Sequence, residues 1–291
     1  MRGERAAPER QGYVRLAVVL GTCWAVTSLI YAITTEEPLL YSLAMLAMVS
    51  LAGAFWVVVL SRQGRRHRAQ TADAQRLARE RGWLFAARDD SVLDGLTGPP
   101  RVTEPYATRD LAVDVTRTLR LLPVDVPGTP ERDGATAVEL ETVTYTYRYV
   151  AQRPGGIPLS ADLQVVAVRL PADLPRTEVM PEAFGRSVLR ARGRRGLELG
   201  VPEFDTRYVV DAEEPRVAWD LLTGGLARRL VDPDLLLGLP WVVEGGWILT
   251  WHDPRFLRSA TIDHCLHLLD TVLAFVPPHV WQDARTEVGR V

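Results

Sequence analysis

The chain has 291 residues, of which 47% are hydrophobic and 24% are charged, and its formal net charge is -2 at pH 7. These values suit a globular domain joined to more apolar material, and the balanced charge gives no support to nucleic-acid binding. All 34 basic residues are arginine, because the sequence contains no lysine. A Walker A loop, a kinase strand lysine, a pyridoxal Schiff base and a serine–lysine dyad are therefore excluded.

Two charge-free apolar segments, 16–33 and 38–60, follow a short N-terminal tail, 1–15. Each approaches the roughly 20 residues that a helix needs to cross a hydrocarbon layer, so a transmembrane hairpin is predicted. A signal peptide is the alternative for the first segment, which lacks a convincing cleavage site. Arginines lie before the first segment and after the second, whereas the turn holds only Glu36 and Glu37. We therefore expect a multi-pass protein of the plasma membrane with both termini in the cytoplasm.

Small residues form a stripe on each apolar segment, including Gly21 on the first and Ala54 on the second. Such stripes let helix backbones approach closely. Packing within the hairpin and a homo-oligomer through Gly21 or Ala54 are both compatible with this pattern.

A basic linker is predicted over 61–82, with helix propensity from about Ala69 to Arg81. Four of its arginines directly follow the second apolar segment and are expected to contact anionic lipid: Arg62, Arg65, Arg66 and Arg68. The remaining residues, 83–291, are numerous enough for one compact cytoplasmic domain.

The first half of this domain is rich in predicted strands. "GWLFAARDD" predicts a short strand, 111–126 and 135–152 two long ones, "LQVVAVRL" another and "RTEVM" a separate short one. In the second long strand, four residues alternate on one face and predict a packed surface: Val143, Tyr145, Tyr147 and Tyr149.

The second half mixes helices and strands. "EAFGRSVLRARGRRG" predicts a helix that ends in a basic turn, and "EFDTRYVV" predicts a strand. "EPRVAWDLLTGGLARRL" predicts one amphipathic helix, with acid at its start and arginine at its end. "PWVVEGGWILTW" predicts a hairpin that turns at Gly245–Gly246, with Glu244 opposite Trp247 and both faces apolar. A final helix is expected from about Arg255 to Phe275, so the domain is predicted to be α+β, with a mainly antiparallel sheet and packed helices.

The basic turn contains four arginines close together in the sequence: Arg190, Arg192, Arg194 and Arg195. A solvated surface explains such a run, since charged clusters usually face water. Contact with anionic lipid headgroups is the alternative.

The stretch "DHCLHLLD", 263–270, raises the question of a metal site. His264, His267 and Asp270 are ligand types, but their spacing supplies neither a fourth ligand nor a supporting shell. A solvated helix with an Asp263–His267 contact explains the same residues, so no metal or cofactor is expected.

Signals of catalysis are weak. Ser187 lacks the second glycine of a nucleophile elbow, and the adjacent side chains of His264 and Cys265 point apart on a helix. A hydrolytic enzyme would need an acid–base group in a cleft, for which the candidates are Asp89, Asp90 and His252. We expect a protein that is not an enzyme.

The segments "VVAVRLPADLPRTEVMPEAF" and "FDTRYVVDAEEPRVAWDLLTGGLARRLVDP" resemble a group of bacterial membrane proteins, mainly actinobacterial. In that group a two-helix hairpin precedes a cytoplasmic α+β domain whose function is not established. Gly224 replaces the proline of the group. The resemblance implies architecture only, and it rests on Val165, Leu170, Leu174, Pro175, Phe204, Val210, Ala218, Leu221, Leu222 and Thr223.

Two functional hypotheses follow. The first is a protein-binding accessory or scaffold at the lipid bilayer, because the anchored domain shows no catalytic constellation. The alternative is a membrane-anchored sensor that binds a small ligand or an anionic lipid headgroup through its arginine-rich surface.

Overall fold

A computed structural model of the chain describes residues 39–93, 107–122, 124, 131–132, 135–136, 138–151, 159–223, 225–232, 238–252 and 259–288. The chain divides into two compact units, Met1–Ala69 and Gln70–Val291. The tail 1–15 and the first apolar segment 16–33, with Gly21, lie outside the described residues.

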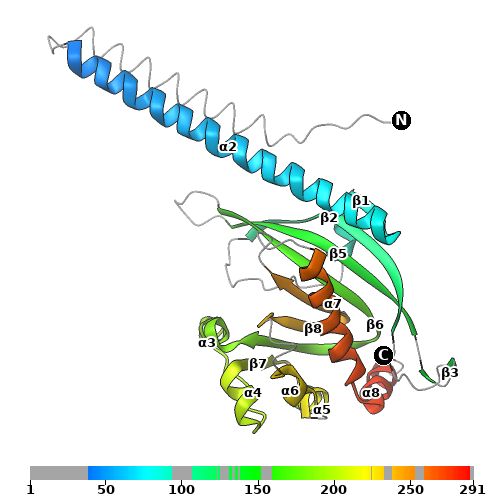
Figure 1. Cartoon of the computed structure of the whole chain (residues 1–291). Coiled ribbons are helices and arrows are strands. Elements are labelled where there is room, and N and C mark those ends of the chain that lie inside the picture. Colours follow the sequence, from blue (N-terminus) through cyan, green and yellow to red (C-terminus); the bar gives the residue numbers. More distant parts are fainter. Residues whose placement is uncertain are drawn as a thin grey trace. The chain divides into compact units, whose positions relative to one another are not determined.

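A single helix, α2 (Leu39–Arg81), contains both the second apolar segment and the predicted linker helix (Figure 1). No glycine or proline interrupts its last turns, from Ala69 to Arg81, so the helix continues until Gly82 ends it with a φ of 68°. In the described part of the chain, no helix combines the length and the apolar character that crossing a membrane requires.

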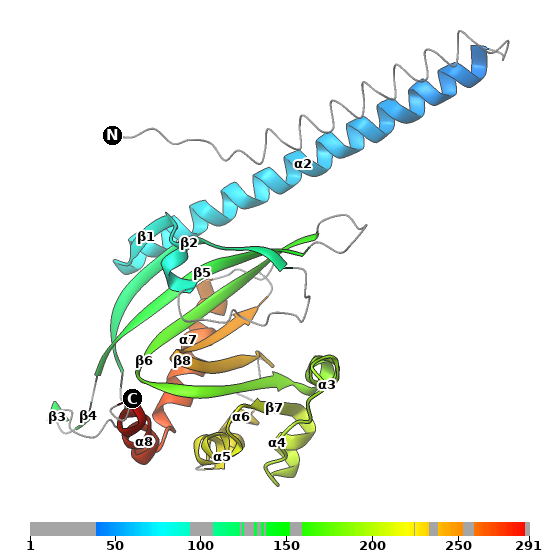
Figure 2. The ribbon, with the colours of Figure 1, turned by 180° about the vertical axis from the view of Figure 1, so that it is seen from behind.

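The second unit is built on a six-stranded antiparallel sheet, as the sequence predicts. The strand order is β1-β2-β5-β6-β7, and β8 also pairs with β6 (Figures 1 and 2). The strands are β1 (Leu84–Arg88), β2 (Ala107–Leu122), β5 (Val138–Ala151), β6 (Leu159–Pro181), β7 (Tyr208–Ala212) and β8 (Trp241–His252). A separate pair joins β3 (Glu131–Arg132) to β4 (Ala135–Thr136).

The hairpin predicted at Gly245–Gly246 is wrong, because β8 runs through both glycines as one strand. The reason is the length of β6, which contains both strands predicted at "LQVVAVRL" and "RTEVM". β8 pairs with β6 on both sides of an irregular stretch of the pairing. Val168 pairs with Ile248 before this stretch, and Thr177 pairs with Val243 after it. A Cβ at Gly246 would lie 2.9 Å from Asp173 Oδ1, so the side chain of Asp173 would have to shift to admit it.

Apolar side chains cover both faces of the sheet. On one face, the predicted row of Val143, Tyr145 and Tyr147 is buried together with Trp247 and Trp251. On the other, the helices α7 (Ser259–Ala274) and α8 (Pro278–Val288) pack against β6 and β8 (Figure 2). Large buried side chains such as Trp281 each contribute roughly 1.5–3 kcal/mol by leaving water. Residues of β8 therefore lie in both clusters, and both of its faces are covered.

The short 3₁₀ helix η1 (Asp90–Leu93) follows β1, at the edge of the sheet farthest from β7. Short helices complete the second unit at the end where β7 lies (Figure 1). The helices are α3 (Glu182–Ala191), α4 (Pro202–Arg207), α5 (Pro215–Thr223) and α6 (Leu226–Leu230).

The strand predicted at "EFDTRYVV" is correct only for its last three residues, since Pro202–Arg207 forms α4 before β7 begins at Tyr208. Pro202 at the first turn favours a helix. Asp205 also accepts hydrogen bonds from the backbone N–H groups of Leu199 and Val201, both at 3.0 Å, and so holds the preceding loop.

The single helix predicted at 215–230 is two helices. Gly225 separates α5 from α6 and has a φ of 105°, which interrupts a right-handed helix. The helix predicted as the final one is α7, and it buries the stripe that its periodicity predicts: Ile262, Cys265, Leu266, Leu269, Val272 and Leu273. The sequence analysis did not predict α8.

Candidate functional site

A cavity of about 290 Å³ lies in the second unit, beside the last turns of α2. Three elements besides α2 contribute to it, namely β5, β6 and α7. Its lining consists of Gln70, Asp73, Ala74, Arg76, Leu77, Glu80, Thr144, Thr146, Gln164 and Ile262.

The sheet gives the cavity a polar floor. Alternation along β5 places Thr142, Thr144 and Thr146 on the face opposite the tyrosine row, and Gln164 of β6 lies directly opposite Thr146. Thr146 Oγ1 donates a hydrogen bond to Gln164 Oε1 at 3.2 Å, and the hydroxyls of Thr144 and Thr116 lie 2.8 Å apart. These side chains are buried, so their polar atoms have little access to solvent.

The helices α2 and α7 contribute apolar and charged side chains to the lining of the cavity. Leu77 and Ile262 supply apolar surface from α2 and α7. On α2, Arg76 Nη2 lies 2.8 Å from Asp73 Oδ1, and its Nε lies 3.8 Å from Glu80 Oε1. All three charged side chains are largely exposed, so these ion pairs add little stability. Two carboxylates beside one guanidinium leave this part of the lining negative.

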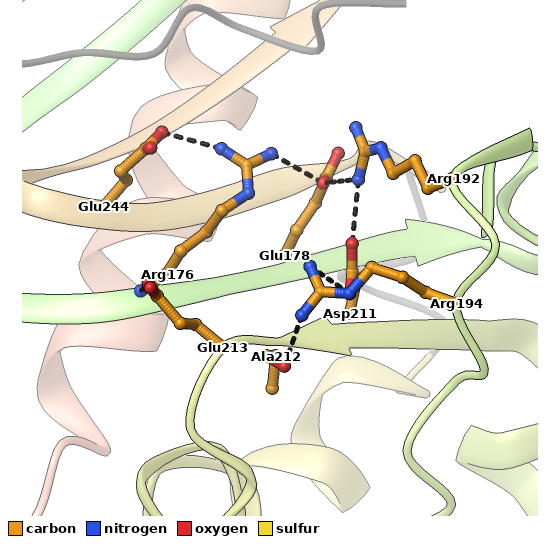
Figure 3. Close-up of polar contacts among 8 residues, drawn as sticks. All are labelled: Arg176, Glu178, Arg192, Arg194, Asp211, Ala212, Glu213 and Glu244. Atoms are coloured by element: carbon orange, nitrogen blue, oxygen red, sulfur yellow. Dashed lines mark hydrogen bonds and ion pairs between the residues drawn. The ribbon is translucent and has the colours of Figure 1, made fainter. Parts of the chain in front are cut away.

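A second polar feature is a buried ion network at the far end of β6 (Figure 3). Glu178 and Asp211 are opposite each other on β6 and β7, and both lie against Arg192, which follows α3. Arg192 Nη1 is 2.6 Å from Glu178 Oε2 and 2.9 Å from Asp211 Oδ2. Arg176 joins the same oxygen of Glu178, at 2.8 Å, to Glu244 of β8, at 2.7 Å.

Electrostatics in this network favour the charged form of Arg192. Burial alone would lower the pKa of Arg192, but the hydrogen bonds and charges of Glu178 and Asp211 outweigh burial and raise that pKa above its ordinary value. Glu178 is fully buried, and its Oε1 has no hydrogen-bond partner within the described residues. Removal of one member would leave a buried charge poorly compensated, which is far more costly than loss of a surface pair.

The structure separates the four arginines of the basic turn into two kinds. Arg192 is largely buried in the ion network, and Arg194 contacts Asp211 Oδ1 at 2.9 Å and the carbonyl of Ala212 at 3.0 Å (Figure 3). Arg190 and Arg195 are exposed. In the linker, Arg65 and Arg68 are exposed, and the side chains of Arg62 and Arg66 lie outside the described residues. Lipid contact through these arginines stays a prediction.

The carboxylates considered for catalysis are held by arginines. Hydrogen bonds from Ser91 hold the pKa of Asp89 below its ordinary value of 3.8 against the opposing effect of burial, and Arg117, at 2.6 Å, lowers it further. The hydrogen bond from Arg88 likewise lowers the pKa of Asp90. Both carboxylates are therefore poor proton acceptors near neutral pH.

His252, the third residue considered for catalysis, is buried opposite Gln164.

The metal candidates on α7 also have other contacts. Asp270 accepts two hydrogen bonds from Arg120, at 3.0 and 2.6 Å, and Asp263 lies 2.7 Å from Arg81. His264 and His267 are exposed. Within the described residues, no group of three or more histidine, cysteine or acidic side chains is placed to hold a metal ion.

Sequence reasoning missed the cavity. Its signal was present in "TVTYTYRY", where threonines occupy the face opposite the tyrosines, but the helix that closes over them comes from residues 70–81, outside the predicted domain. The partners of Arg192 were also missed, since they lie on strands distant in sequence.

An α+β domain with an antiparallel six-stranded sheet is the class that the structure defines. No protein-family model matches the chain, and no curated protein matches it. Among solved structures, it is similar to the crystal structure of the mycobacterial trehalose monomycolate transport factor A, TtfA. The identity is 12% and the TM-score 0.40, and the match covers 72% of this chain and 98% of that chain. A match this distant assigns no family and no function.

Proposed function

We propose that this chain is a double-pass protein of the plasma membrane whose α+β domain binds another protein, as an accessory or scaffold. The observation that carries the proposal is a strip of exposed leucines on β1 and β2. Leu84, Leu119 and Leu121 expose 75%, 62% and 56% of their surface.

The strand register places these leucines on one face of the sheet. Leu84 is opposite Arg117, and Leu119 and Leu121 follow Arg117 at alternate positions along β2. Leu122, on the opposite face, is buried. Charged residues border the strip, since Leu119 and Leu121 pair with Glu141 and Glu139 on β5. An apolar centre with a charged rim is the composition of many protein–protein interfaces.

The proposed anchor is the pair of apolar segments 16–33 and 38–60. Met48, Leu51 and Phe55 recur with helical spacing on α2 and expose 60%, 71% and 65% of their surface. Large apolar side chains exposed in this way favour an apolar environment such as lipid. The arginines that follow at 62, 65, 66 and 68 support a cytoplasmic end at that point.

A photo-crosslinking experiment tests the protein contact. Benzoylphenylalanine replaces Leu119 in the full-length chain, in the cells that naturally make it, and Arg228, exposed on α6, is the control position. The proposal predicts a discrete adduct of protein-sized mass from position 119 and none of that mass from position 228. Leu84→Ser with Leu121→Ser should abolish the adduct. Equal adducts from both positions, or none from position 119, would overturn the leucine strip as a binding surface.

The anchor is tested separately. The full-length chain should stay with the membrane after alkaline carbonate extraction, and a cysteine introduced as Thr35→Cys should react with an impermeant thiol reagent in whole cells. Release by carbonate would contradict the anchor, and protection of the cysteine until lysis would reverse the proposed orientation.

A further inference from the structure

The cavity beside α2 has no role in the proposed contact through the leucine strip, and its floor contains hydrogen-bonding groups that the fold leaves partly unused. Gln164 accepts from Thr146 through Oε1. Within the described parts of the chain, no residue accepts a hydrogen bond from Gln164 Nε2, although this side chain is about 96% buried, with an exposure of 4%. Gln164 lines the cavity, and its Nε2 is not among the described polar atoms that are buried without a partner, so its amide N–H groups are open to a molecule in the cavity.

The threonines extend this floor. Thr144 and Thr116 share one hydrogen bond between two hydroxyls, in which only one hydroxyl can be the donor. Of these two residues, Thr144 lines the cavity. Its hydroxyl and the amide of Gln164 give the floor donors and acceptors without any net charge.

The size of the cavity and the charge of its lining limit which molecules can bind there. A volume of about 290 Å³ lies at the lower end of the range for small-molecule sites, roughly 300–1,000 Å³, so a small molecule fits. Asp73 and Glu80 outnumber Arg76 among the charged lining residues, and Asp73 already binds Arg76. An anionic ligand would meet net repulsion. A purely apolar ligand would leave Gln164 and the threonines unpaired.

We infer that this cavity binds a small uncharged molecule that carries hydroxyl or amide groups. Gln164 and the floor threonines hydrogen-bond its polar groups, and Leu77 and Ile262 cover its apolar part. Because six of the ten lining residues lie on α2, the bound molecule joins the end of this helix to the sheet.

Two pairs of variants separate binding from folding. Ala74→Leu fills the cavity with a good helix former, and Ala72→Leu makes the same change at an exposed neighbour that does not line the cavity. Thr146→Val removes a floor hydroxyl. Thr142→Val is its control, because Thr142 lies on the same face of β5 outside the lining and its buried Oγ1 has no partner among the described residues.

The first measurement is native mass spectrometry of the full-length chain and the four variants, each extracted from the membrane of its natural cell. The expected result is a stoichiometric adduct of small mass that survives in Ala72→Leu and Thr142→Val. It should be lost in Ala74→Leu and reduced about tenfold in occupancy in Thr146→Val. The released molecule should be uncharged at pH 7.

The second measurement detects binding of added molecules, in case the natural ligand is lost during extraction. Saturation-transfer NMR on the same proteins uses glycerol, myo-inositol and acetamide as neutral probes, with myo-inositol 1-phosphate as the anionic probe. Signal from at least one neutral probe, abolished by Ala74→Leu, supports the inference. No adduct together with no saturation transfer means a cavity that holds only water and overturns it, as does preference for the phosphate. Neither result depends on the leucine strip, so this inference and the proposed function fail separately.

Discussion

Glu178 and Asp211 face each other across β6 and β7 and share one nitrogen of Arg192, at 2.6 and 2.9 Å. This arrangement fixes the segment after α3 onto the sheet, because Arg192 is the residue that directly follows the helix. In the sequence Arg192 belongs to a run of arginines typical of a solvated surface, but in the structure it forms buried ion pairs that hold the segment after α3 on the sheet.

Arg192→Ala should lower the free energy of unfolding by about 3 kcal/mol, near the lower end of the range for broken buried ion pairs, because Arg176 still binds Glu178 and Arg194 still binds Asp211. Arg190→Ala, two positions away and exposed, should change it by less than about 0.5 kcal/mol. Urea denaturation followed by tryptophan fluorescence measures both. Equal effects would show that Arg192 is not held as described.

Gly225→Ala should destabilise the second unit by about 1–2 kcal/mol from its left-handed backbone alone. A further loss is expected because the new Cβ would lie 3.3 Å from Phe275. Gly200→Ala is the comparison, since its φ of 72° lies closer to the left-handed region that other residues can adopt, and nothing lies within 4 Å of the added carbon. Thermal unfolding should therefore occur at a lower temperature for Gly225→Ala than for Gly200→Ala.

Acid should weaken the contact between η1 and β2. The pKa values of Asp89 and Asp90 are lowered in the folded state, chiefly by the hydrogen bonds from Ser91 and Arg88 respectively. Their contribution to stability is therefore complete above the unfolded value of about 3.9 and is lost as pH falls through the lower folded values.

Asp89→Asn should accordingly cost stability at pH 7, and its difference from the parent chain should shrink below about pH 4. Urea titrations at several pH values measure this difference. Glu198→Gln, at an exposed position, is the matched charge removal. A difference between Asp89→Asn and the parent that stays constant down to pH 2 would contradict the assignment.

Burial raises the pKa of Cys265 to about 12 and shields the thiol from reagents. In a Cys23→Ser background, native Cys265 should react with N-ethylmaleimide roughly a hundredfold or more slowly than in urea, because the thiolate is the reacting species. Ala72→Cys provides an exposed reference thiol. Similar rates for Cys265 and the Ala72→Cys thiol in the folded chain would place Cys265 at the surface.

The sequence predicted the features that depend on local periodicity. Alternation on β5 identified Val143, Tyr145 and Tyr147 as one packed face, and helical spacing identified the buried stripe from Ile262 to Leu273. Both patterns follow from which side of an element meets the core, and the sequence shows this directly.

Features that depend on distant partners were not predictable in this way. Gly245–Gly246 is a strong hairpin signal by local rules, and only the long β6 beside it makes β8 continuous. Arg120 binds Asp270, which lies 150 positions later in the sequence, so the sequence of α7 alone could not indicate this partner. The cavity likewise depends on four separate segments, α2, β5, β6 and α7, which meet only in the folded chain.

The pairing of β6 also has a consequence while the chain is being synthesised. Its edge toward β8 carries Val165 to Val168, which no partner can cover until β7 and the helices α3 to α6 have left the ribosome. During that interval β6 presents an apolar strand with open backbone groups, a template for pairing with other chains. Arg169, at the end of that apolar run, is the position where a charge limits such pairing, and in the finished fold it lies over the ring of Trp247.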